Sequence, residues 1–234
     1  MNIKIVFNKG NDSFRHIWVR QKLDNLYDNE RNALLDVGAG LKPYKDVYQQ
    51  IGWDFKTHDF SKYIPEQLKK QDNNIGLHDN YENYPYHDYV CDIQDIPEDN
   101  QYDLILLTEV LEHVPDPVAT LKKMYDLLSV NGYLVTTVPS MSLIHQAPYY
   151  YSSGLSQFWF VHHANELNLK IKEIVINGDY SDFIGQELSR ILNSRFKFIG
   201  SSFLIRLVKS LIRFYVSKEI NSSSSFGVYF VAQK

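Results

Sequence analysis

The chain has 234 residues, 44% of them hydrophobic and 22% charged, with a formal net charge of −4 at pH 7. These values are typical of one soluble domain with a substantial core, and the charge gives no reason to expect nucleic acid as a partner. A single cysteine, Cys91, excludes an internal disulfide and a cysteine-based zinc site. The apolar run in residues 1–10 is too short for a signal peptide, and no stretch is apolar enough to span a membrane, so a cytoplasmic protein is expected.

The first elements are predicted from the spacing of apolar residues. Residues 14–27 place apolar side chains among charges at helical spacing, which favours an amphipathic helix leading into the domain. Ala33–Val37 is a short apolar run followed by Gly38-Ala39-Gly40, a pattern typical of a buried strand and a tight turn. Further strands are predicted over residues 53–59, 89–91, 103–107 and 132–138, with a helix over 117–128.

This alternation of strands and helices predicts a parallel sheet with right-handed crossovers. Residues 72–88 are rich in Asn, Asp and Tyr and are expected to form a surface insertion. Towards the end of the chain, strands are predicted over residues 171–176 and 226–232, with a long helical stretch between them.

Chemically useful residues follow the predicted strands. Gly38 and Gly40 follow the first strand, where glycine lets a ligand approach the backbone closely, and Asp59 ends the second strand at a spacing suited to ribose hydroxyls. Asp92 and Ile93 follow the third strand, and Thr108 ends the fourth. Because ligands bind at the carboxyl ends of parallel strands, the series predicts a nucleotide-type site. The alternative is that Asp36, Asp59 and Asp92 only cap the helices that follow them.

The glycine loop also distinguishes between cofactors. A dinucleotide site has a third glycine, three positions after the second, where the pyrophosphate meets the start of a helix. Here that position is Pro43, which disfavours a nicotinamide-dependent oxidoreductase without excluding one.

Three segments resemble motifs of class I S-adenosylmethionine-dependent methyltransferases. They are Leu34–Gly40, the stretch Tyr102–Ile105 followed by Glu109–Val114, and Asn131–Val135. The resemblance implies that Gly38 and Gly40 flank the methionine part of S-adenosylmethionine and that Thr108 lies near it. It implies that Asp59 binds the ribose, that Asp92 binds the adenine amino group and that Ile93 packs on the ring. Asp36 would support the loop or bind the cofactor's amino group.

The resemblance also completes the expected architecture. It implies a Rossmann-like, doubly wound α/β fold whose mostly parallel sheet ends in an antiparallel strand, with a helical insertion before that strand. We therefore expect one domain over residues 1–234, comprising a helical lead (1–32), a cofactor-binding core (33–140) and a last part (141–234). The last part would contain a substrate loop, a basic amphipathic insertion (186–218) and the closing strand.

Methyl transfer to a hydroxyl requires loss of a proton, for which histidine is a natural base. His113 follows the fourth strand, and its role as base or as a structural residue is left open. His145 lies in the loop after the fifth strand, within a His-x-x-Pro-Tyr segment (residues 145–149) that resembles one in methyltransferases of bacterial surface glycans. His162 and His163 fall in a helical pattern, and no convincing set of metal ligands is apparent, so no metal is expected.

Residues 188–218 contain seven Lys or Arg and no acid. Within residues 202–216, apolar residues fall on one helical face and Arg206, Lys209 and Arg213 on the opposite face. Such a helix suits the anionic surface of a membrane, and it also suits packing on the domain with a solvated basic face. RNA binding is disfavoured because interleaved aromatic readout motifs are missing.

The leading hypothesis is S-adenosylmethionine-dependent O-methylation of a sugar, a glycan or a lipid-linked intermediate. The protein would be cytoplasmic and peripheral at the inner face of the membrane, with its oligomeric state left open. Two alternatives remain, a nicotinamide-dependent oxidoreductase and a non-catalytic, membrane-docked binding module on the same fold.

Overall fold

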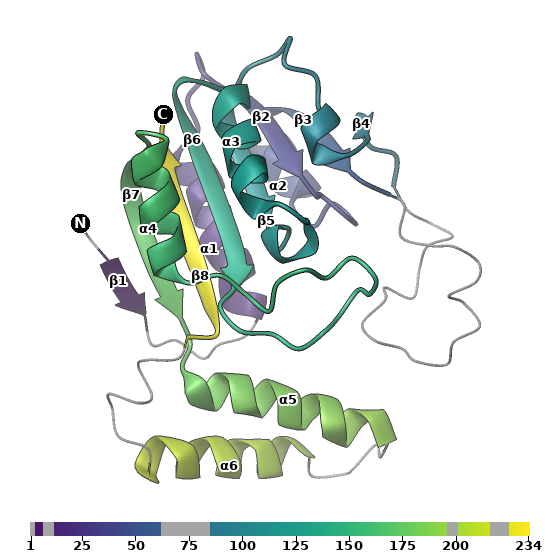
Figure 1. Ribbon diagram of the computed structural model, residues 1–234, viewed down its shortest axis with the longest axis vertical. Helices are drawn as coiled ribbons and strands as arrows, with labels where there is room; N and C mark the ends of the chain where they lie inside the picture. Colours follow the sequence, from purple (N-terminus) through teal and green to yellow (C-terminus); the bar gives the residue numbers. More distant parts are fainter. Residues whose placement is uncertain (1–2, 7–11, 62–84, 196–200, 216–224) are drawn as a thin grey trace.

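The computed structural model describes residues 3–6, 12–61, 85–195, 201–215 and 225–234. Within them, eight strands form one sheet in the order β1-β7-β8-β6-β5-β2-β3-β4 (Figure 1). The strands are β1 (Ile3–Val6), β2 (Ala33–Val37), β3 (Asp54–Asp59), β4 (Tyr89–Val90), β5 (Tyr102–Thr108), β6 (Leu128–Pro139), β7 (Lys170–Asn177) and β8 (Gly227–Gln233).

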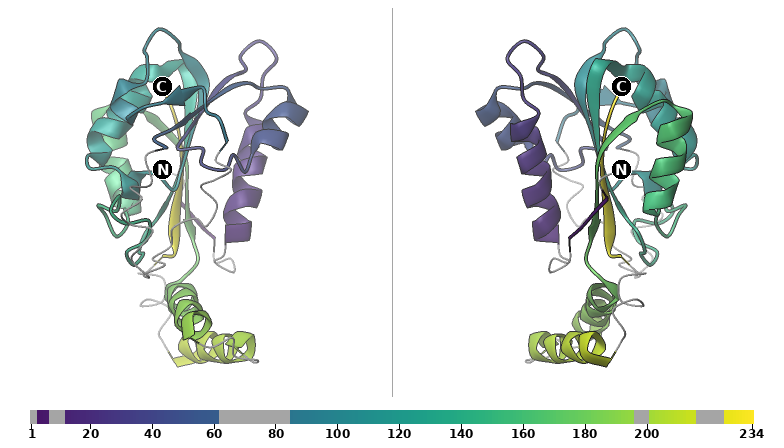
Figure 2. Two further views of the ribbon diagram at one scale, coloured as in Figure 1. Left: turned by 90° about the vertical axis from the view of Figure 1, so that its right-hand side faces the viewer. Right: turned by 90° about the vertical axis from the view of Figure 1, so that its left-hand side faces the viewer.

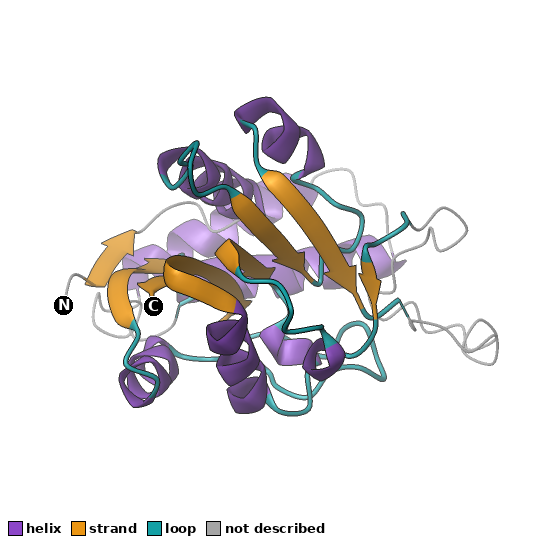
Figure 3. Ribbon diagram, turned by 90° about the horizontal axis from the view of Figure 1, so that it is seen from above, coloured by secondary structure: helices purple, strands orange, loops and turns teal. Residues whose placement is uncertain are grey.

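Helices cover both faces of the sheet. The helices are α1 (Asp12–Asn25), α2 (Lys45–Ile51), α3 (Pro117–Leu127), α4 (Gln157–Glu166), α5 (Tyr180–Arg195) and α6 (Ser201–Tyr215), with short 3-10 turns η3 (Ile93–Asp95) and η4 (Leu111–His113). α1 and α2 lie on one face and α3 and α4 on the other, as the side views and the view from above show (Figures 2 and 3). α5 and α6 pack on each other beyond one end of the sheet (Figure 1).

The strand directions confirm the predicted sheet. β2 pairs in parallel with β3 and β5, and β5 pairs in parallel with β6. β8 pairs antiparallel with both β6 and β7, as expected for the closing strand. The register aligns Thr108 of β5 with Thr137 of β6, so the carboxyl ends of the central strands lie at one edge.

Two hydrophobic layers explain why the central strands are continuously apolar. Trp18 and Leu23 of α1 are buried in one layer, and Leu121 and Met124 of α3 are buried in the other. The central strands are therefore shielded from water on both faces, and Leu34–Val37 of β2 is fully buried. A parallel strand that is buried on both faces has a mostly apolar sequence, without the alternation of apolar and polar residues seen in a strand with one face in water.

The structure differs from the sequence prediction near the N-terminus. The helical lead (1–32) also contains β1, which pairs in parallel with β7 at the edge of the sheet. A four-residue strand has too few side chains to show a period of its own, and its position depends on β7, more than 160 residues away. Of the predicted insertion over residues 72–88, the part 72–84 lies outside the described residues.

The helical insertion predicted over 186–218 consists of two helices, and the first begins earlier, at Tyr180. Gly178 takes a positive φ of 70° at the end of β7, and the side chain of Asp179 then accepts a hydrogen bond from the Asp182 N–H at 3.1 Å. This cap starts the helix within three residues of the strand. Residues 196–200 and 216–218 of the predicted insertion lie outside the described residues.

The orientation of α6 corrects the prediction that its basic residues face outward. The Lys209 ammonium lies 2.5 Å from the Asp182 carboxylate, and the Arg213 guanidinium lies 3.1 Å from the Asp179 carboxylate. Both acids lie near the start of α5 and are buried, so they draw these two cations onto the domain. Part of the apolar face is left exposed, and its members are Phe203, Leu204, Leu207, Leu211, Phe214 and Tyr215.

Candidate active site

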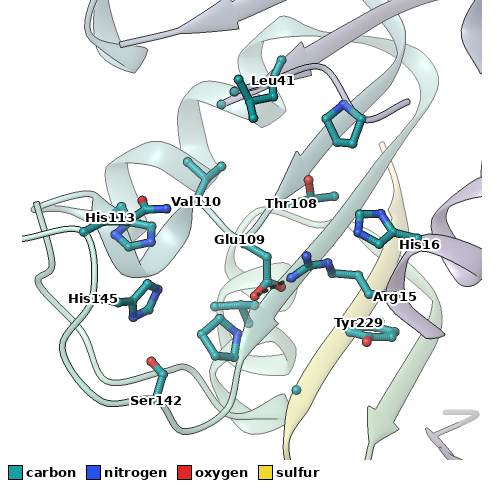
Figure 4. A pocket seen from close by; sticks show the side chains of 18 of the residues that line it. Arg15, His16, Leu41, Thr108, Glu109, Val110, His113, Ser142, His145 and Tyr229 are labelled. Atoms are coloured by element: carbon teal, nitrogen blue, oxygen red, sulfur yellow. Dashed lines mark ion pairs between the residues drawn. The ribbon is translucent and has the colours of Figure 1, made fainter. Parts of the chain in front are cut away.

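A cavity of about 580 Å³ opens at the carboxyl ends of β2, β3 and β5, within the size range of small-molecule sites. Figure 4 shows it from close by. Six predicted site residues line it, namely Gly38, Gly40, Asp59, Thr108, His113 and His145. Glu109, the first residue of the Glu109–Val114 motif at the end of the fourth predicted strand, also lines it, whereas three further lining residues were not anticipated from the sequence, namely Arg15, His16 and Tyr229.

A second cavity of about 390 Å³ lies next to the first, and both residues predicted to contact the adenine, Asp92 and Ile93, line it. Gly38, Val110 and His113 line both cavities. The Asp92 carboxylate accepts a hydrogen bond from the Gln94 N–H at 3.0 Å, so this acid also caps η3, as the capping alternative supposed. The two cavities therefore adjoin each other at the glycine loop, and Gly38 lies where they meet.

Gly38 must be glycine for two independent reasons. Its φ is +69°, which L residues with a side chain rarely adopt. A Cβ atom at this position would also lie 2.4 Å from Cγ2 of Val110, which follows β5. The close approach of the glycine loop to the residue that follows β5 therefore depends on the missing side chain.

Asp59 holds the other side of the glycine loop. Its carboxylate accepts hydrogen bonds from the Gly40 N–H at 2.9 Å and from the Ser61 N–H at 2.8 Å. The side chain is buried yet lines the larger cavity. A carboxylate has further lone pairs beyond these two bonds, so Asp59 has the capacity to bind a hydroxyl of a ligand as well.

Asp36 is the one predicted cofactor residue that lines neither cavity. It is buried behind the loop, where the Tyr48 hydroxyl donates a hydrogen bond to it at 2.8 Å. Burial raises the pKa of its carboxyl to about 7, despite the opposing effect of the Tyr48 hydrogen bond. This position fits support of the loop rather than contact with the amino group of a ligand.

Glu109 and Arg15 form an ion pair in the larger cavity (Figure 4). The Arg15 guanidinium from α1 lies 3.0 Å from one Glu109 oxygen, and the Thr137 hydroxyl donates to the other at 2.9 Å. Glu109 has a positive φ of 54°, which turns the chain sharply after β5. Glu109 belongs to the quoted fourth-strand motif, but no pattern in the sequence connects it with Arg15.

His113 and His145 come together from two segments, η4 and the loop after β6. Their ring centroids are 4.8 Å apart (Figure 4). The backbone carbonyl of Glu112 accepts hydrogen bonds from the N–H groups of Tyr151 and Ser152, at 2.9 and 3.2 Å, and so anchors the loop beside η4. The structure thus unites the two predicted catalytic histidines at one end of the cavity.

Glu112 is the main residue that sequence reasoning missed. Its side chain is fully buried, and its two carboxyl oxygens have no hydrogen-bond partner among the described residues. Burial, and then the negative charge of Glu109, raise the pKa of Glu112 well above its ordinary value. One Glu112 oxygen lies 3.7 Å from Nε2 of His113. In the sequence, only its position within the Glu109–Val114 motif indicates that Glu112 lies near the site.

Curated relatives match only part of this chain. Two ubiquinone biosynthesis O-methyltransferases, from two strains of Actinobacillus pleuropneumoniae, are 27% and 26% identical to it over 117 residues. The match covers 50% of this chain and 48% of each relative, so the chain spans about half the length of these curated relatives.

Solved structures share the fold at low sequence identity. A phosphoethanolamine N-methyltransferase 2 of Haemonchus contortus, in complex with S-adenosyl-L-methionine, matches with a TM-score of 0.53 and 16% identity, covering 94% of this chain and 52% of that chain. A SAM-dependent methyltransferase from Archaeoglobus fulgidus gives 0.53 and 16%, covering 95% and 97%. The cyclase SpnF gives 0.55 and 15%, covering 94% and 80%. The last match shows that the fold alone does not set the reaction.

A family model gives the broadest sequence match. The model described as a methyltransferase domain matches residues 13–195, from α1 to the end of α5. This range includes the glycine loop, all four strand ends that carry predicted site residues, and both cavity histidines. Since the match covers well over half of the sequence, the chain belongs to the methyltransferase domain family.

Proposed function

We propose that this protein transfers a methyl group from S-adenosylmethionine to a hydroxyl oxygen of an acceptor. The observation that carries the proposal is the pair of adjoining cavities that meet at Gly38 and contain the predicted strand-end residues. Family membership supports S-adenosylmethionine as the methyl donor, and the O-methyltransferase names of the curated relatives support oxygen as the acceptor atom.

The described residues fit S-adenosylmethionine. The smaller cavity offers Asp92 and Ile93 to an adenine ring, and Asp59 stands where ribose hydroxyls would be bound. Gly38, Gly40 and Thr108 would surround the methionine part. The absence of a side chain at Gly38 lets the loop pack against Val110, which lines both cavities. When bound, the cofactor supplies an electrophilic methyl group on a sulfonium.

The protein's own contribution is chiefly alignment and exclusion of water, which account for most of the acceleration in an in-line displacement. The Arg15–Glu109 ion pair fixes one wall of the larger cavity. His113 and His145 stand at the acceptor end, where they would promote loss of the hydroxyl proton.

For the acceptor we propose a sugar, a glycan or a lipid-linked intermediate. The support is the His145–Tyr149 segment, together with the aromatic residues beside it. The Tyr149 carbonyl accepts a hydrogen bond from His113, which lines both cavities, and the nearby Tyr151 is exposed at the surface beside it. An exposed ring at the mouth of a site offers a flat face on which a sugar can stack.

Calorimetry with S-adenosylmethionine and S-adenosylhomocysteine tests the cofactor. We expect the wild type to bind both, and Asp59→Ala to weaken binding at least about 100-fold, or about 2.8 kcal/mol, because the variant loses the ribose contact and releases the Gly40 N–H. NAD(H) is the comparison ligand. Tighter binding of NAD(H) than of S-adenosylmethionine would contradict the proposal in favour of an oxidoreductase.

Activity separates an enzyme from a binding module. Labelled methyl from S-adenosylmethionine is incubated with the protein and a cell extract, which is then fractionated into lipid, glycan and protein. We expect label in the glycan or lipid fraction. Cofactor binding without any transfer, combined with full biological activity after changes at Gly38 and Asp59, would instead support the non-catalytic module.

We also propose that α6 docks the protein on a membrane surface, where a lipid-linked acceptor would be available. No helix among the described residues is long and apolar enough to cross a membrane. The support for surface docking is the exposed apolar face of α6, where Phe203, Phe214 and Tyr215 are between 73% and 80% exposed. Because Lys209 and Arg213 pair with acids of the chain itself, we expect insertion of apolar side chains to dominate over charge attraction.

Vesicle flotation tests the docking of α6. The combined variant Leu207→Ser, Leu211→Ser and Phe214→Ser is expected to reduce vesicle binding at least about tenfold, because it removes apolar area from the lipid-facing side. Phe158→Ser is the matched control, since Phe158 is 68% exposed on α4, away from this helix. Equal flotation of wild type and the α6 variant, with or without anionic lipid, would contradict the docking proposal.

A further inference from the structure

Glu112, His113 and His145 form a cluster of possible metal ligands beside the larger cavity, which the two histidines line and Glu112 does not. Each offers one ligand atom, and the three atoms all lie within 4.8 Å of one another. Glu112 and His113 belong to η4, whereas His145 comes from the loop after β6, so the cluster is created by tertiary structure. In Figure 4 the His113 and His145 rings lie next to each other, and their planes are nearly perpendicular, at 86°.

Both imidazole rings are oriented by backbone carbonyls. Nδ1 of His113 lies 2.6 Å from the Tyr149 carbonyl oxygen, and Nδ1 of His145 lies 2.9 Å from the Leu143 carbonyl oxygen. A carbonyl only accepts hydrogen bonds, so each Nδ1 carries the proton and each Nε2 presents a lone pair. Metal-ligating histidines are characteristically held in this way, with the second ring nitrogen donating to a carbonyl or carboxylate.

Glu112 supplies an independent indication of a cation. A fully buried carboxyl group whose two oxygens lack hydrogen bonds is costly unless a cation or donor compensates it. The nearby cation Arg15 pairs with Glu109 at 3.0 Å and donates no hydrogen bond to either Glu112 oxygen. A metal ion between Glu112 and the two Nε2 atoms would do so.

The spacing is close to that of a loaded site. Ligand atoms held about 2.1 Å from one ion lie at most about 4.2 Å apart. Oε1 of Glu112 and Nε2 of His113 are 3.7 Å apart, within this limit. One ring nitrogen of His145 lies within 4.8 Å of a ligand atom of each of the other two residues, which exceeds the limit by only a few tenths of an ångström. A small rotation of the His145 side chain, which lies on a loop, would close that difference.

We propose that Glu112, His113 and His145 bind one divalent transition-metal ion, which holds the acceptor hydroxyl for methylation. Two imidazoles and one carboxylate suit Mn²⁺, Fe²⁺, Co²⁺ or Zn²⁺, and three protein ligands leave coordination positions open on the cavity side. This assignment replaces the expectation from sequence that no metal is bound. The open positions favour an acceptor that has a second oxygen next to the methylated hydroxyl.

The role in catalysis rests on the proposed methyl transfer, whereas metal binding itself does not. An ion at this place lowers the pKa of a coordinated hydroxyl, which loses its proton to a solvent water. The oxygen lone pair then forms the new O–C bond as the C–S bond breaks. The electrons of that bond remain on sulfur, giving S-adenosylhomocysteine. His113 and His145 would act as ligands in this scheme and not as bases.

Metal binding is measured on full-length protein freed of metal with a chelator and then titrated separately with Mn²⁺, Co²⁺ and Zn²⁺ by calorimetry. The visible absorption of bound Co²⁺ reports the coordination. We expect one ion per chain for wild type, and an affinity at least about 100-fold weaker in Glu112→Gln and in His145→Asn. The matched control changes the exposed cluster on α4, with His162→Asn and Glu166→Gln, and is expected to retain binding at the buried site.

The outcomes separate this proposal from the proposed function. Stoichiometric metal binding that both variants weaken supports the site, even if no methyl transfer is found. Binding that these variants leave unchanged, or that the α4 control abolishes, overturns it. So does the absence of stoichiometric binding of all three metals to folded wild-type protein, and methyl transfer that persists in the presence of chelator overturns the catalytic role of the ion.

Discussion

Gly38→Ala is expected to abolish detectable binding of S-adenosylmethionine and to destabilise the fold. The new Cβ would lie 2.4 Å from Cγ2 of Val110, and alanine would have to adopt a φ of +69°. The left-handed backbone costs about 1–2 kcal/mol and the overpacking about 1–3 kcal/mol. Relief of the clash would displace the loop at the junction of both cavities, so the affinity is expected to fall at least about 100-fold. Thermal unfolding and calorimetry measure the two effects.

Two controls identify the cause of that loss. Gly52→Ala places alanine at another positive φ, +105°, at the end of α2, and is expected to destabilise the fold while cofactor affinity is retained. The double variant Gly38→Ala, Val110→Ala removes the clashing methyl groups and should recover part of the affinity lost in the single variant. Normal S-adenosylmethionine affinity in Gly38→Ala would show that the loop does not contact the cofactor.

His145→Asn is expected to lower kcat by a factor of about 100–1,000 while S-adenosylmethionine affinity changes little. The ring lies beside His113 in the loop after β6, whereas the residues proposed to bind the cofactor lie at the ends of β2 to β5. The loss therefore falls on activation of the acceptor hydroxyl. Steady-state kinetics with the cell-extract fraction that accepts the methyl group gives kcat, and calorimetry gives the affinity for S-adenosylmethionine, so the two effects are measured separately.

His162→Asn is the matched control for this substitution. His162 is exposed on α4, and its ring pairs only with neighbours on that helix, His163 and Glu166, among its described contacts. We expect wild-type kcat for it. A wild-type kcat for His145→Asn would remove this residue from the chemistry. An equal loss of kcat and of S-adenosylmethionine affinity would instead show that His145 positions the cofactor.

The order of strands and helices between residues 33 and 138 was predictable because each element has its own apolar pattern. Ala33–Val37 is apolar apart from Asp36, Leu104–Leu107 is apolar throughout, and the structure buries Leu34–Val37 and Leu104–Leu107 between helical layers. Alternating elements leave few topologies, since parallel crossovers are right-handed. The strand ends then follow from chain order, which is why Gly38, Asp59 and Thr108 were assigned to one site before any contact was known.

Positions that depend on distant segments were not predictable in the same way. Among the described strands, β1 joins the sheet only by pairing in parallel with β7 at the edge. α6 has a strongly amphipathic pattern, but the pattern does not say which face meets the protein. Asp179 and Asp182 decided this by drawing Lys209 and Arg213 inward, which left Phe214 exposed.

The sequence by itself determined the family, the parallel core and the glycine loop, because these depend on short local motifs and on their order. Only the tertiary structure decided that Asp36 lies behind that loop and that Glu112 is buried beside two histidines. A contact between η4 and residue 145 depends on the path of a loop, fixed by the bonds from Tyr151 and Ser152 to the Glu112 carbonyl. No local periodicity predicts the path of this loop, because the loop is stabilised by packing between segments that lie far apart in the chain.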